Sequence, residues 1–164
     1  MSNQIIVVGF MGSGKTVVSQ ELQRQLNCGY VDLDQLIESE HGKIADIFSQ
    51  SGEDRFRELE FGFFEQALSL PVKIISTGGG LVTHAPSLAR LKSLGQVVWL
   101  RATYETVLKR IENDQENLRP LADNQLRNRY DFRQSLYESV ANQVIDVDYL
   151  SVEEVAEKII NRYR

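Results

Sequence analysis

Residues 9–16 read Gly-Phe-Met-Gly-Ser-Gly-Lys-Thr and lie between an apolar run, Ile5-Ile6-Val7-Val8, and a segment with helical periodicity. A strand, a glycine-rich turn and a helix in this order favour a phosphate-binding loop, because consecutive backbone N–H groups can surround a pyrophosphate where no Cβ blocks their approach. Lys15 would then reach the β- and γ-phosphates, and the Thr16 hydroxyl would ligate Mg²⁺. The positive end of the helix would stabilise the anion further. A turn that binds nothing would have no use for lysine followed by threonine.

Length and composition predict one domain. The chain has 164 residues, 42% of them hydrophobic, which is enough for a single sizeable core. Its net charge of −5 gives no overall field that would attract nucleic acid or an anionic membrane, so any anion site must be local. The single cysteine, Cys28, cannot form an intramolecular disulfide, which fits a reducing compartment. The run at 5–8 lacks a preceding basic region and is too short for a signal sequence or a membrane span, so we expect a cytoplasmic monomer.

Apolar runs and helical periodicities alternate along the whole chain. The runs predict strands at 5–8, 30–34, 72–76, 96–100 and 144–147. Runs without polar alternation are typical of strands covered on both faces, and strands that alternate with helices imply parallel βαβ units with right-handed crossovers. The sequence therefore predicts an α/β fold, a three-layer sandwich around a five-stranded parallel sheet.

Two carboxylates, Asp32 and Asp34, come at the end of the second predicted strand, where ligands bind in an open α/β sheet. Side chains two residues apart on a strand point the same way, so the pair would share one space unless the strand has already ended. Two acids near phosphates need a cation or a hydroxyl-bearing ligand beside them. We predict that one holds the water shell of Mg²⁺, and that the other positions a substrate hydroxyl and can accept its proton. The alternative is a pair of solvated surface acids.

Three successive glycines, Gly78, Gly79 and Gly80, follow Thr77 at the end of the third predicted strand. Glycines in a row cost backbone entropy, and what they permit is close approach of a ligand to backbone N–H groups. An ordinary turn would need only one glycine. We therefore predict a second ligand-binding loop here.

Arginines gather in the long helix after Gly52, in segment 112–124, which has no periodicity, and on the helix that follows. They are Arg55, Arg57, Arg119, Arg127, Arg129 and Arg133. The planar guanidinium suits carboxylate and phosphate groups, although a solvated position or a surface ion pair is the commoner fate of any one arginine. No Cys/His/Asp spacing suggests a zinc site.

These motifs resemble those of the shikimate kinases, in order and spacing, over nearly the whole chain. The matching segments are residues 9–16, Asp32-Leu33-Asp34, Gly52-Glu53, Phe56-Arg57-Glu58-Leu59-Glu60, Thr77-Gly78-Gly79-Gly80, Arg119-Pro120-Leu121, Arg133 and Leu136-Tyr137-Glu138. The resemblance implies transfer of the γ-phosphoryl group of ATP to the 3-hydroxyl of shikimate, a step toward chorismate and the aromatic amino acids. It also implies a fold similar to the nucleoside monophosphate kinases, with strand order 2-3-1-4-5, a substrate-binding helical region at about 33–62 and a lid at about 112–124.

The resemblance further implies roles for single residues. It implies a nucleotide site formed by Gly12, Ser13, Gly14, Lys15, Thr16, Arg110 and Arg119, a shikimate site formed by Asp34, Arg57, Gly78, Gly79, Gly80 and Arg133, and a Mg²⁺ site formed by Thr16 and, through water, Asp32. Lys15, Asp34 and Arg119 would be catalytic. Arg57 and Arg133 would hold the substrate carboxylate, and Glu60 would orient Arg57.

Two other interpretations stay open. One is a different small-molecule or nucleotide kinase on the same scaffold, such as a gluconate kinase or a nucleoside monophosphate kinase, although a nucleobase would need an aromatic or amide-lined slot. The other is a GTPase-like switch or a nucleotide-dependent binding module, but the guanine-specific Asn-Lys-x-Asp strand end is missing from the sequence. Thr16, Val17 and Ser19 depart from the residues most common in the shikimate kinases, where serine, threonine and glycine are found.

Overall fold

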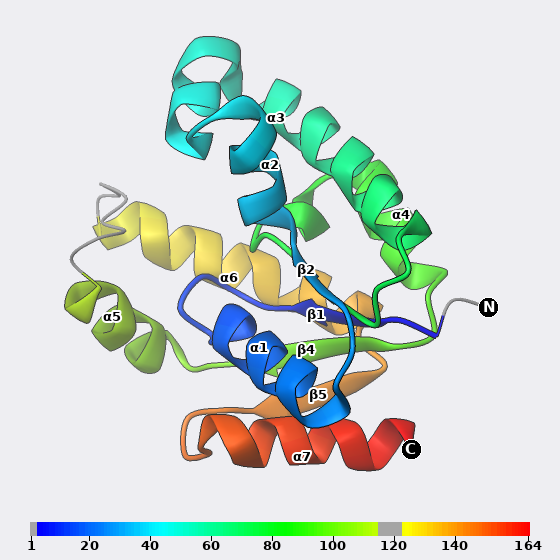
Figure 1. The fold of residues 1–164 in the computed structure, drawn as a ribbon. Helices are drawn as coiled ribbons and strands as arrows, with labels where there is room; N and C mark the ends of the chain where they lie inside the picture. The colour runs from blue at the N-terminus through cyan, green and yellow to red at the C-terminus, as the bar shows by residue number, and fades with distance from the viewer. Residues whose placement is uncertain (1–2, 115–122) are drawn as a thin grey trace.

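The computed structural model describes residues 3–114 and 123–164 and contains one five-stranded parallel sheet (Figure 1). The strands are β1 (Ile5–Val8), β2 (Tyr30–Asp32), β3 (Ile74–Ser76), β4 (Val97–Arg101) and β5 (Gln143–Asp146). They are arranged in the order β2-β3-β1-β4-β5, and every neighbouring pair is parallel. The predicted fold class and strand order are both confirmed.

The central strands are apolar along their whole length because helices cover both faces of the sheet. All four residues of β1 are buried, and so are all three of β3 and the first four of β4. Ile75 of β3 lies in register between Ile6 of β1 and Val31 of β2, so apolar side chains align across the sheet. Burying one such side chain contributes about 1.5–3 kcal/mol, so each of these strands stabilises the fold.

Helices form the two outer layers of the sandwich. They are α1 (Lys15–Leu26), α2 (Leu33–His41), α3 (Ile44–Ser69), α4 (Ala85–Lys92), α5 (Tyr104–Asn113), α6 (Asp123–Val140) and α7 (Val152–Tyr163), with a 3₁₀ turn, η1 (Leu81–Thr83), before α4. The helices α1 and α7 contact each other on one face, and α4 and α6 contact each other on the other (Figure 1). No helix among the described residues is long and apolar enough to cross a membrane.

Local sequence signals set the helix ends. Asn27 ends α1 in the left-handed conformation, with φ of 47°, which asparagine tolerates better than most residues. Thr103 caps α5 by accepting a hydrogen bond from the Thr106 N–H. Ser151 and Glu154 form a complete capping box at the start of α7. These ends agree with the periodicity of the sequence.

The second strand ends earlier than expected. β2 stops at Asp32, and α2 begins at the next residue, so Asp34 lies in the first turn of a helix and not on a strand. The cause is local: the Asp32 side chain accepts a hydrogen bond from the Gln35 N–H at 3.1 Å and therefore acts as the N-cap of α2. The two carboxylates consequently belong to different elements.

The helices α2 and α3 form a projection above the carboxyl ends of the strands (Figure 1). Gly42 separates the two helices, and Gly52 interrupts α3 with φ of 81° and ψ of 167°. A small second core, made of Ile37, Ile44, Phe56 and Phe63, holds the projection together. It positions the part of α3 that follows Gly52 over the sheet edge.

Candidate active site

The phosphate-binding loop connects β1 to α1. Gly14 caps α1 in a left-handed conformation, with φ of 93°, and as a glycine it has no side chain that could accept a hydrogen bond from the first-turn N–H groups. These donors and the helix dipole together favour an anion. Gly9 has to be a glycine for a steric reason: a Cβ there would lie 2.7 Å from both the Leu100 carbonyl oxygen and Ser13 Oγ. The predicted residues Gly12, Ser13 and Gly14 therefore lie in a loop with the geometry of a phosphate site.

Two cationic side chains brace this loop. Lys15 Nζ donates to the Phe10 carbonyl oxygen at 3.1 Å, across the loop. Arg110, on α5, donates from Nη1 to the Gly12 carbonyl oxygen at 2.9 Å. Both residues also line the main cavity, so their cationic groups lie where a nucleotide's phosphates would enter.

Thr16 and Asp32 form a hydroxyl–carboxylate pair beside the loop. Thr16 Oγ1 donates to Asp32 Oδ2 at 3.0 Å, and the Tyr30 hydroxyl donates to the same oxygen at 3.3 Å. Because the Thr16 proton is directed at Asp32, the lone pairs of its oxygen remain available to a cation. Hard oxygen donors of this kind suit Mg²⁺, which binds through one or two protein groups together with substrate phosphates. In residues 3–114 and 123–164, no three His, Cys, Asp or Glu side chains gather as an all-protein metal site.

A buried ion pair lies on α3, facing the glycine triplet. Arg57 is 8% exposed and donates from Nη1 to Glu60 Oε1 at 2.8 Å. Glu53 contributes a longer contact, 3.4 Å, to Arg57 Nη2. Burial raises the pKa of the Glu60 carboxyl above its usual range, Arg57 offsets part of this effect, and Asp34 adds to it. The neighbouring Arg55, by contrast, is exposed and pairs with Glu58.

Arg133 is the second buried arginine, on α6, and is 5% exposed. Burial lowers the pKa of its guanidinium, and the nearby cations Arg57 and Arg129 lower it further. No carboxylate of the described residues lies within ion-pair distance of Arg133. A buried cation in such surroundings favours binding of an anion from outside the chain.

The glycine triplet passes between these groups, where side chains would not fit. A Cβ on Gly78 would lie 2.5 Å from Glu60 Oε2 and 2.9 Å from Asp34 Oδ1. A Cβ on Gly80 would lie 2.0 Å from Arg57 Nη2. Thr77 anchors the triplet to the sheet, since its N–H and hydroxyl both donate to the Val7 carbonyl oxygen, at 3.1 and 3.0 Å.

One cavity of about 880 Å³ joins all these parts. Its lining includes the expected residues Gly12, Lys15, Thr16, Asp32, Asp34, Arg57, Gly78, Gly79, Gly80, Arg110 and Arg133. Arg119 lies outside the described residues, and so does most of the expected lid. Arg127 pairs with Asp131 and does not line the cavity.

Sequence patterns missed several residues of the site. Ile44, Phe48 and Phe56 form an apolar wall of the cavity, and Glu38 adds charge to it, beside Arg129, which was among the candidate arginines. Helical periodicity can indicate that Phe48 and Phe56 face inward but not that they face a cavity. Tyr30 was missed because nothing in the local pattern identifies Asp32 as its partner.

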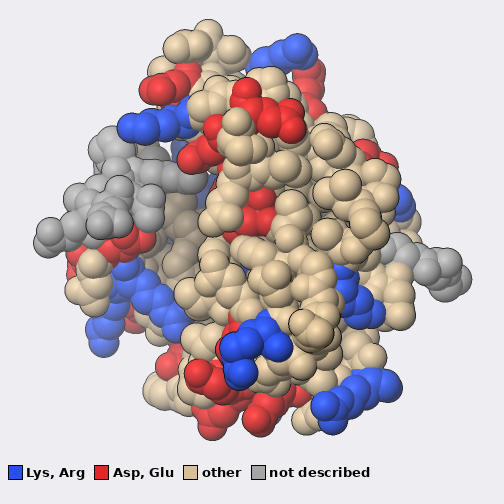
Figure 2. All heavy atoms as spheres, viewed as in Figure 1, with Lys and Arg blue, Asp and Glu red and all other residues tan. Residues whose placement is uncertain are grey.

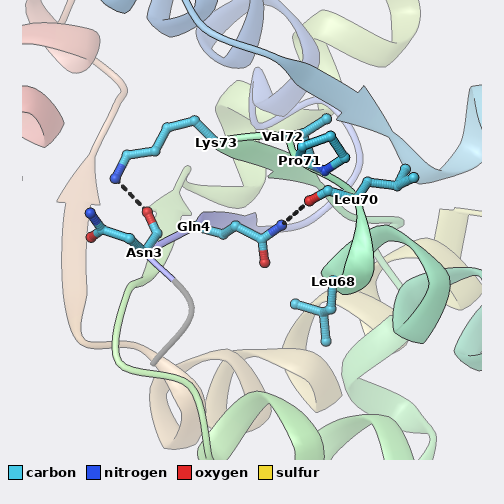
Figure 3. Close-up of a pocket in the computed structure, with 7 residues that line it drawn as sticks. All are labelled: Asn3, Gln4, Leu68, Leu70, Pro71, Val72 and Lys73. Carbon is cyan, nitrogen blue, oxygen red and sulfur yellow. Dashed lines mark hydrogen bonds between the residues drawn. The ribbon is translucent and has the colours of Figure 1, made fainter.

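Other surfaces do not suggest a site. A hollow of about 400 Å³ lies near the amino ends of the strands, where Gln4 Nε2 donates to the Leu70 carbonyl oxygen and Lys73 to that of Asn3 (Figure 3). Its polar groups bond one another, and its lining holds one charged side chain. Figure 2 shows cationic and anionic side chains interspersed over one face of the molecule, without a patch of one sign.

Comparisons with known proteins agree on one family. The family model described as shikimate kinase matches residues 11–164. A shikimate kinase of Sulfurihydrogenibium sp. is 39% identical over 98% of this chain and 97% of its own length, and one of Enterococcus faecalis is 39% identical over 98% of both. The structure of shikimate kinase from Acinetobacter baumannii in complex with shikimate has a TM-score of 0.89 at 33% identity, covering 97% of this chain and 91% of that one. A gluconokinase from Sinorhizobium meliloti, with a TM-score of 0.62 at 15% identity, shares the fold alone.

Proposed function

The chain belongs to the shikimate kinase family, and we propose from the geometry of its site how its own residues perform the reaction. With ATP and Mg²⁺ it phosphorylates shikimate at the 3-hydroxyl, giving shikimate 3-phosphate and ADP on the route to chorismate and the aromatic amino acids. The proposals below concern the individual residues.

The observation that carries the residue assignment is the charge of the cavity opposite the phosphate loop. Glu60 balances Arg57, whereas Arg133 has no described carboxylate partner and lies among other cations. The carboxylate of shikimate would supply the missing negative charge, in a fork geometry that guanidinium groups recognise. Asp34, on the same cavity, would accept hydrogen bonds from ring hydroxyls. This combination suits a small polyhydroxy acid.

The transfer step needs alignment more than covalent chemistry. The oxygen of the 3-hydroxyl attacks the γ-phosphorus, the bond from that phosphorus to the β–γ bridging oxygen breaks, and ADP leaves with the electron pair. Asp34 positions the hydroxyl and accepts its proton. Lys15 and the loop N–H groups stabilise charge on the phosphate oxygens, which is the largest contribution the loop can make.

Thr16 and Asp32 would hold Mg²⁺, Asp32 through a water molecule, as the direction of the Thr16–Asp32 hydrogen bond supports. When bound, the ion neutralises charge on the β- and γ-phosphates. Tyr30 and the Gln35 N–H keep the Asp32 carboxylate in one orientation, so the acid would not need to reorient when the nucleotide binds.

We also propose the remaining parts of the family pattern for this chain. The single kinase domain would span residues 1–164, with the substrate-binding region at about 33–62 and a lid at about 112–124 that carries Arg119 to the transferring phosphate. We further propose a cytoplasmic monomer that binds neither nucleic acid nor membranes. The net charge of −5 supports this, as does the scatter of the exposed large hydrophobic residues over separate elements, among them Val17, Phe132 and Val144.

The experiment is ADP release from MgATP by the purified protein, with shikimate, quinate, gluconate, AMP and CMP offered separately. We expect rapid release with shikimate and slow background release with the others. Quinate is the sharpest comparison, because it keeps the carboxylate and several hydroxyls but has a saturated ring. Rapid release with gluconate or a nucleotide would contradict shikimate as the substrate. It would not contradict the assignment of residues 9–16 as the phosphate-binding loop.

A further inference from the structure

Tyr137 is a buried polar residue that the proposed mechanism does not use. It lies on α6, is 1% exposed, and packs its ring against Trp99 with 5.7 Å between centroids. Its hydroxyl donates to the Gly79 carbonyl oxygen at 2.5 Å, across 58 residues of sequence. The bond ties α6 to the middle glycine of the triplet that borders the shikimate site.

Arg133 lies one helical turn before Tyr137, and its guanidinium is close to the same glycine. Its Nη1 is 3.6 Å from the position that a Cβ on Gly79 would occupy, and its Cζ lies 5.5 Å from the centre of the Phe10 ring. Tyr137 lies near the Arg133 guanidinium and raises the pKa of that arginine, which offsets part of the effect of burial. Arg133 and Tyr137 therefore both adjoin Gly79, and the Tyr137–Gly79 hydrogen bond is the link that fixes this arrangement.

We propose that Tyr137 is a positioning residue, which fixes the Arg133 guanidinium and the Gly79 backbone in the arrangement that receives the substrate carboxylate. The inference rests on the proposed role of Arg133. Tyr137 itself does not touch the substrate. It acts by limiting where Arg133 can point and where the triplet can move.

The physical need for such a residue follows from the surroundings of Arg133. The Arg133 guanidinium has no described carboxylate partner, and it lies over the Phe10 ring and near the Tyr137 side chain. A Tyr137→Phe change keeps the ring and its packing but leaves the Gly79 carbonyl without this partner and removes the polar group near Arg133. A buried acceptor left unsatisfied is costly, so we expect the triplet and Arg133 to shift and shikimate affinity to fall by roughly tenfold.

Tyr130 offers a matched control on the same helix. Its hydroxyl donates to a backbone carbonyl oxygen, that of Ala102, at 2.6 Å, and neither Tyr130 nor Ala102 lines the cavity. Tyr130→Phe therefore removes a bond of the same kind and nearly the same length from α6. Any effect of general loosening of α6 should appear in both variants.

The test is calorimetric titration of both variants with shikimate and, separately, with MgADP. We expect Tyr137→Phe to weaken shikimate binding about tenfold while MgADP affinity stays within about twofold, and Tyr130→Phe to leave both affinities near wild type. Equal losses in the two variants, or unchanged shikimate affinity in Tyr137→Phe, would overturn the inference. If Tyr137→Phe is only marginally folded, saturating MgADP stabilises the native state and the shikimate titration is made on that complex.

The Arg133→Ala variant separates this inference from the role on which it rests. If Tyr137 acts through Arg133, adding Tyr137→Phe to Arg133→Ala should cost much less affinity than it costs in the wild type. The methyl ester of shikimate, which lacks the charge, should likewise bind the wild type and Tyr137→Phe almost equally. Unchanged shikimate affinity in Arg133→Ala would refute the assignment of Arg133. If adding Tyr137→Phe to Arg133→Ala still lowers shikimate affinity about tenfold, this would refute only the claim that Tyr137 acts through Arg133.

Discussion

Asp32 and Asp34 are neighbours in sequence that have different partners, because the chain changes from strand to helix between them. Asp32 is held by Thr16, by Tyr30 and by the Gln35 N–H, and is therefore tied to the cation side of the site. Asp34 faces the small space beside Gly78, on the side of the arginines. Each carboxylate can therefore be tested without disturbing the other.

The first prediction concerns Asp34. Asp34→Asn keeps the size of the side chain but removes the proton acceptor, and positioned bases contribute about 10²–10⁴-fold, so kcat should fall by at least two orders of magnitude. Steady-state kinetics with shikimate and MgATP measure this, and circular dichroism checks the fold. Glu40→Gln, which removes an exposed charge from the same helix, is the control. Near-normal turnover in a folded Asp34→Asn variant would rule out its assigned role.

The second prediction concerns Gly80. Its added Cβ would lie 2.0 Å from Arg57 Nη2, so Gly80→Ala must push the guanidinium out of its ion pair with Glu60. We expect shikimate KM to rise about tenfold or more, because Arg57, which we propose binds the substrate carboxylate, is displaced. Gly95→Ala is the comparison, since a Cβ there meets nothing within 4 Å. Equal KM values for the two variants would mean that Arg57 does not bind shikimate.

At the residue scale, the sequence predicts a site residue where a motif is contiguous, and it does not reveal contacts between distant residues. Lys15 and the glycine triplet could be identified because their neighbours in sequence carry the signal. Tyr137 was noticed as part of a motif, but its partner, Gly79, is 58 residues away. Such a hydrogen bond depends on how α6 packs on the sheet, and no local pattern reports that packing.

The helix α3 shows how a single backbone conformation places a functional face. Gly52 has φ of 81° and ψ of 167°, a region that is essentially restricted to glycine. The bend lets the segment before it close the small α2–α3 core, while the segment after it presents Arg57 and Glu60 to the triplet. Gly62, in the same helix, has ordinary helical geometry and open space around it.

The third prediction is that these two glycines respond oppositely to alanine. Gly52→Ala should lower the free energy of unfolding by about 1–3 kcal/mol, the cost of strained backbone, although a Cβ there meets nothing within 4 Å. Gly62→Ala should raise it by about 0.5–1 kcal/mol, because alanine is the better helix former. Urea unfolding of both variants measures the difference. Unchanged or raised stability in Gly52→Ala would show that Gly52 does not need its positive φ.

Element boundaries were predictable only where the chain carries a clear local signal. The break at Gly42 and the cap at Ser151 could be identified from residue type. The end of β2 could not, because an aspartate at that position is compatible both with a strand and with the N-cap of a helix. The Asp32 side chain settles the choice by capping α2, and Asp32, opposite Ser76, is the last residue of β2 in register with β3.

At the scale of the whole molecule, the sheet determines which distant groups meet. The order β2-β3-β1-β4-β5 brings the ends of β1, β2 and β3 together, and with them the phosphate loop, Asp32 and the glycine triplet. Alternation of strands and helices predicts a parallel sheet but leaves the strand order open, because the order depends on which strands each crossover connection places side by side. The family resemblance supplied the order, and the structure confirms it.

Beside the site formed at these strand ends, the carboxylic acid of Glu60 is buried with no exposed surface. Burial raises the pKa of Glu60, Asp34 raises it further, and Arg57 and Arg133 offset only part of the effect. Because the pKa of a glutamate in an unfolded chain is about 4.3, the folded protein binds more protons than the unfolded one above that pH. The stability contributed by this proton is fully present below the unfolded pKa and is lost as pH rises through the folded one.

The last prediction follows from the raised pKa of Glu60, which makes the stability of the folded protein fall as pH rises. Glu60→Gln keeps an oxygen that can accept from Arg57 but cannot titrate, so the stability of the wild type relative to this variant should decrease as pH rises from about 4.5 toward 8. Urea unfolding of both proteins across this range measures the trend, and Glu58→Gln, an exposed change on the same helix, controls for the loss of one charge. A relative stability that instead increases with pH would mean that the Arg57 ion pair outweighs burial. Glu60 would then be anionic in the folded protein over the whole of this pH range.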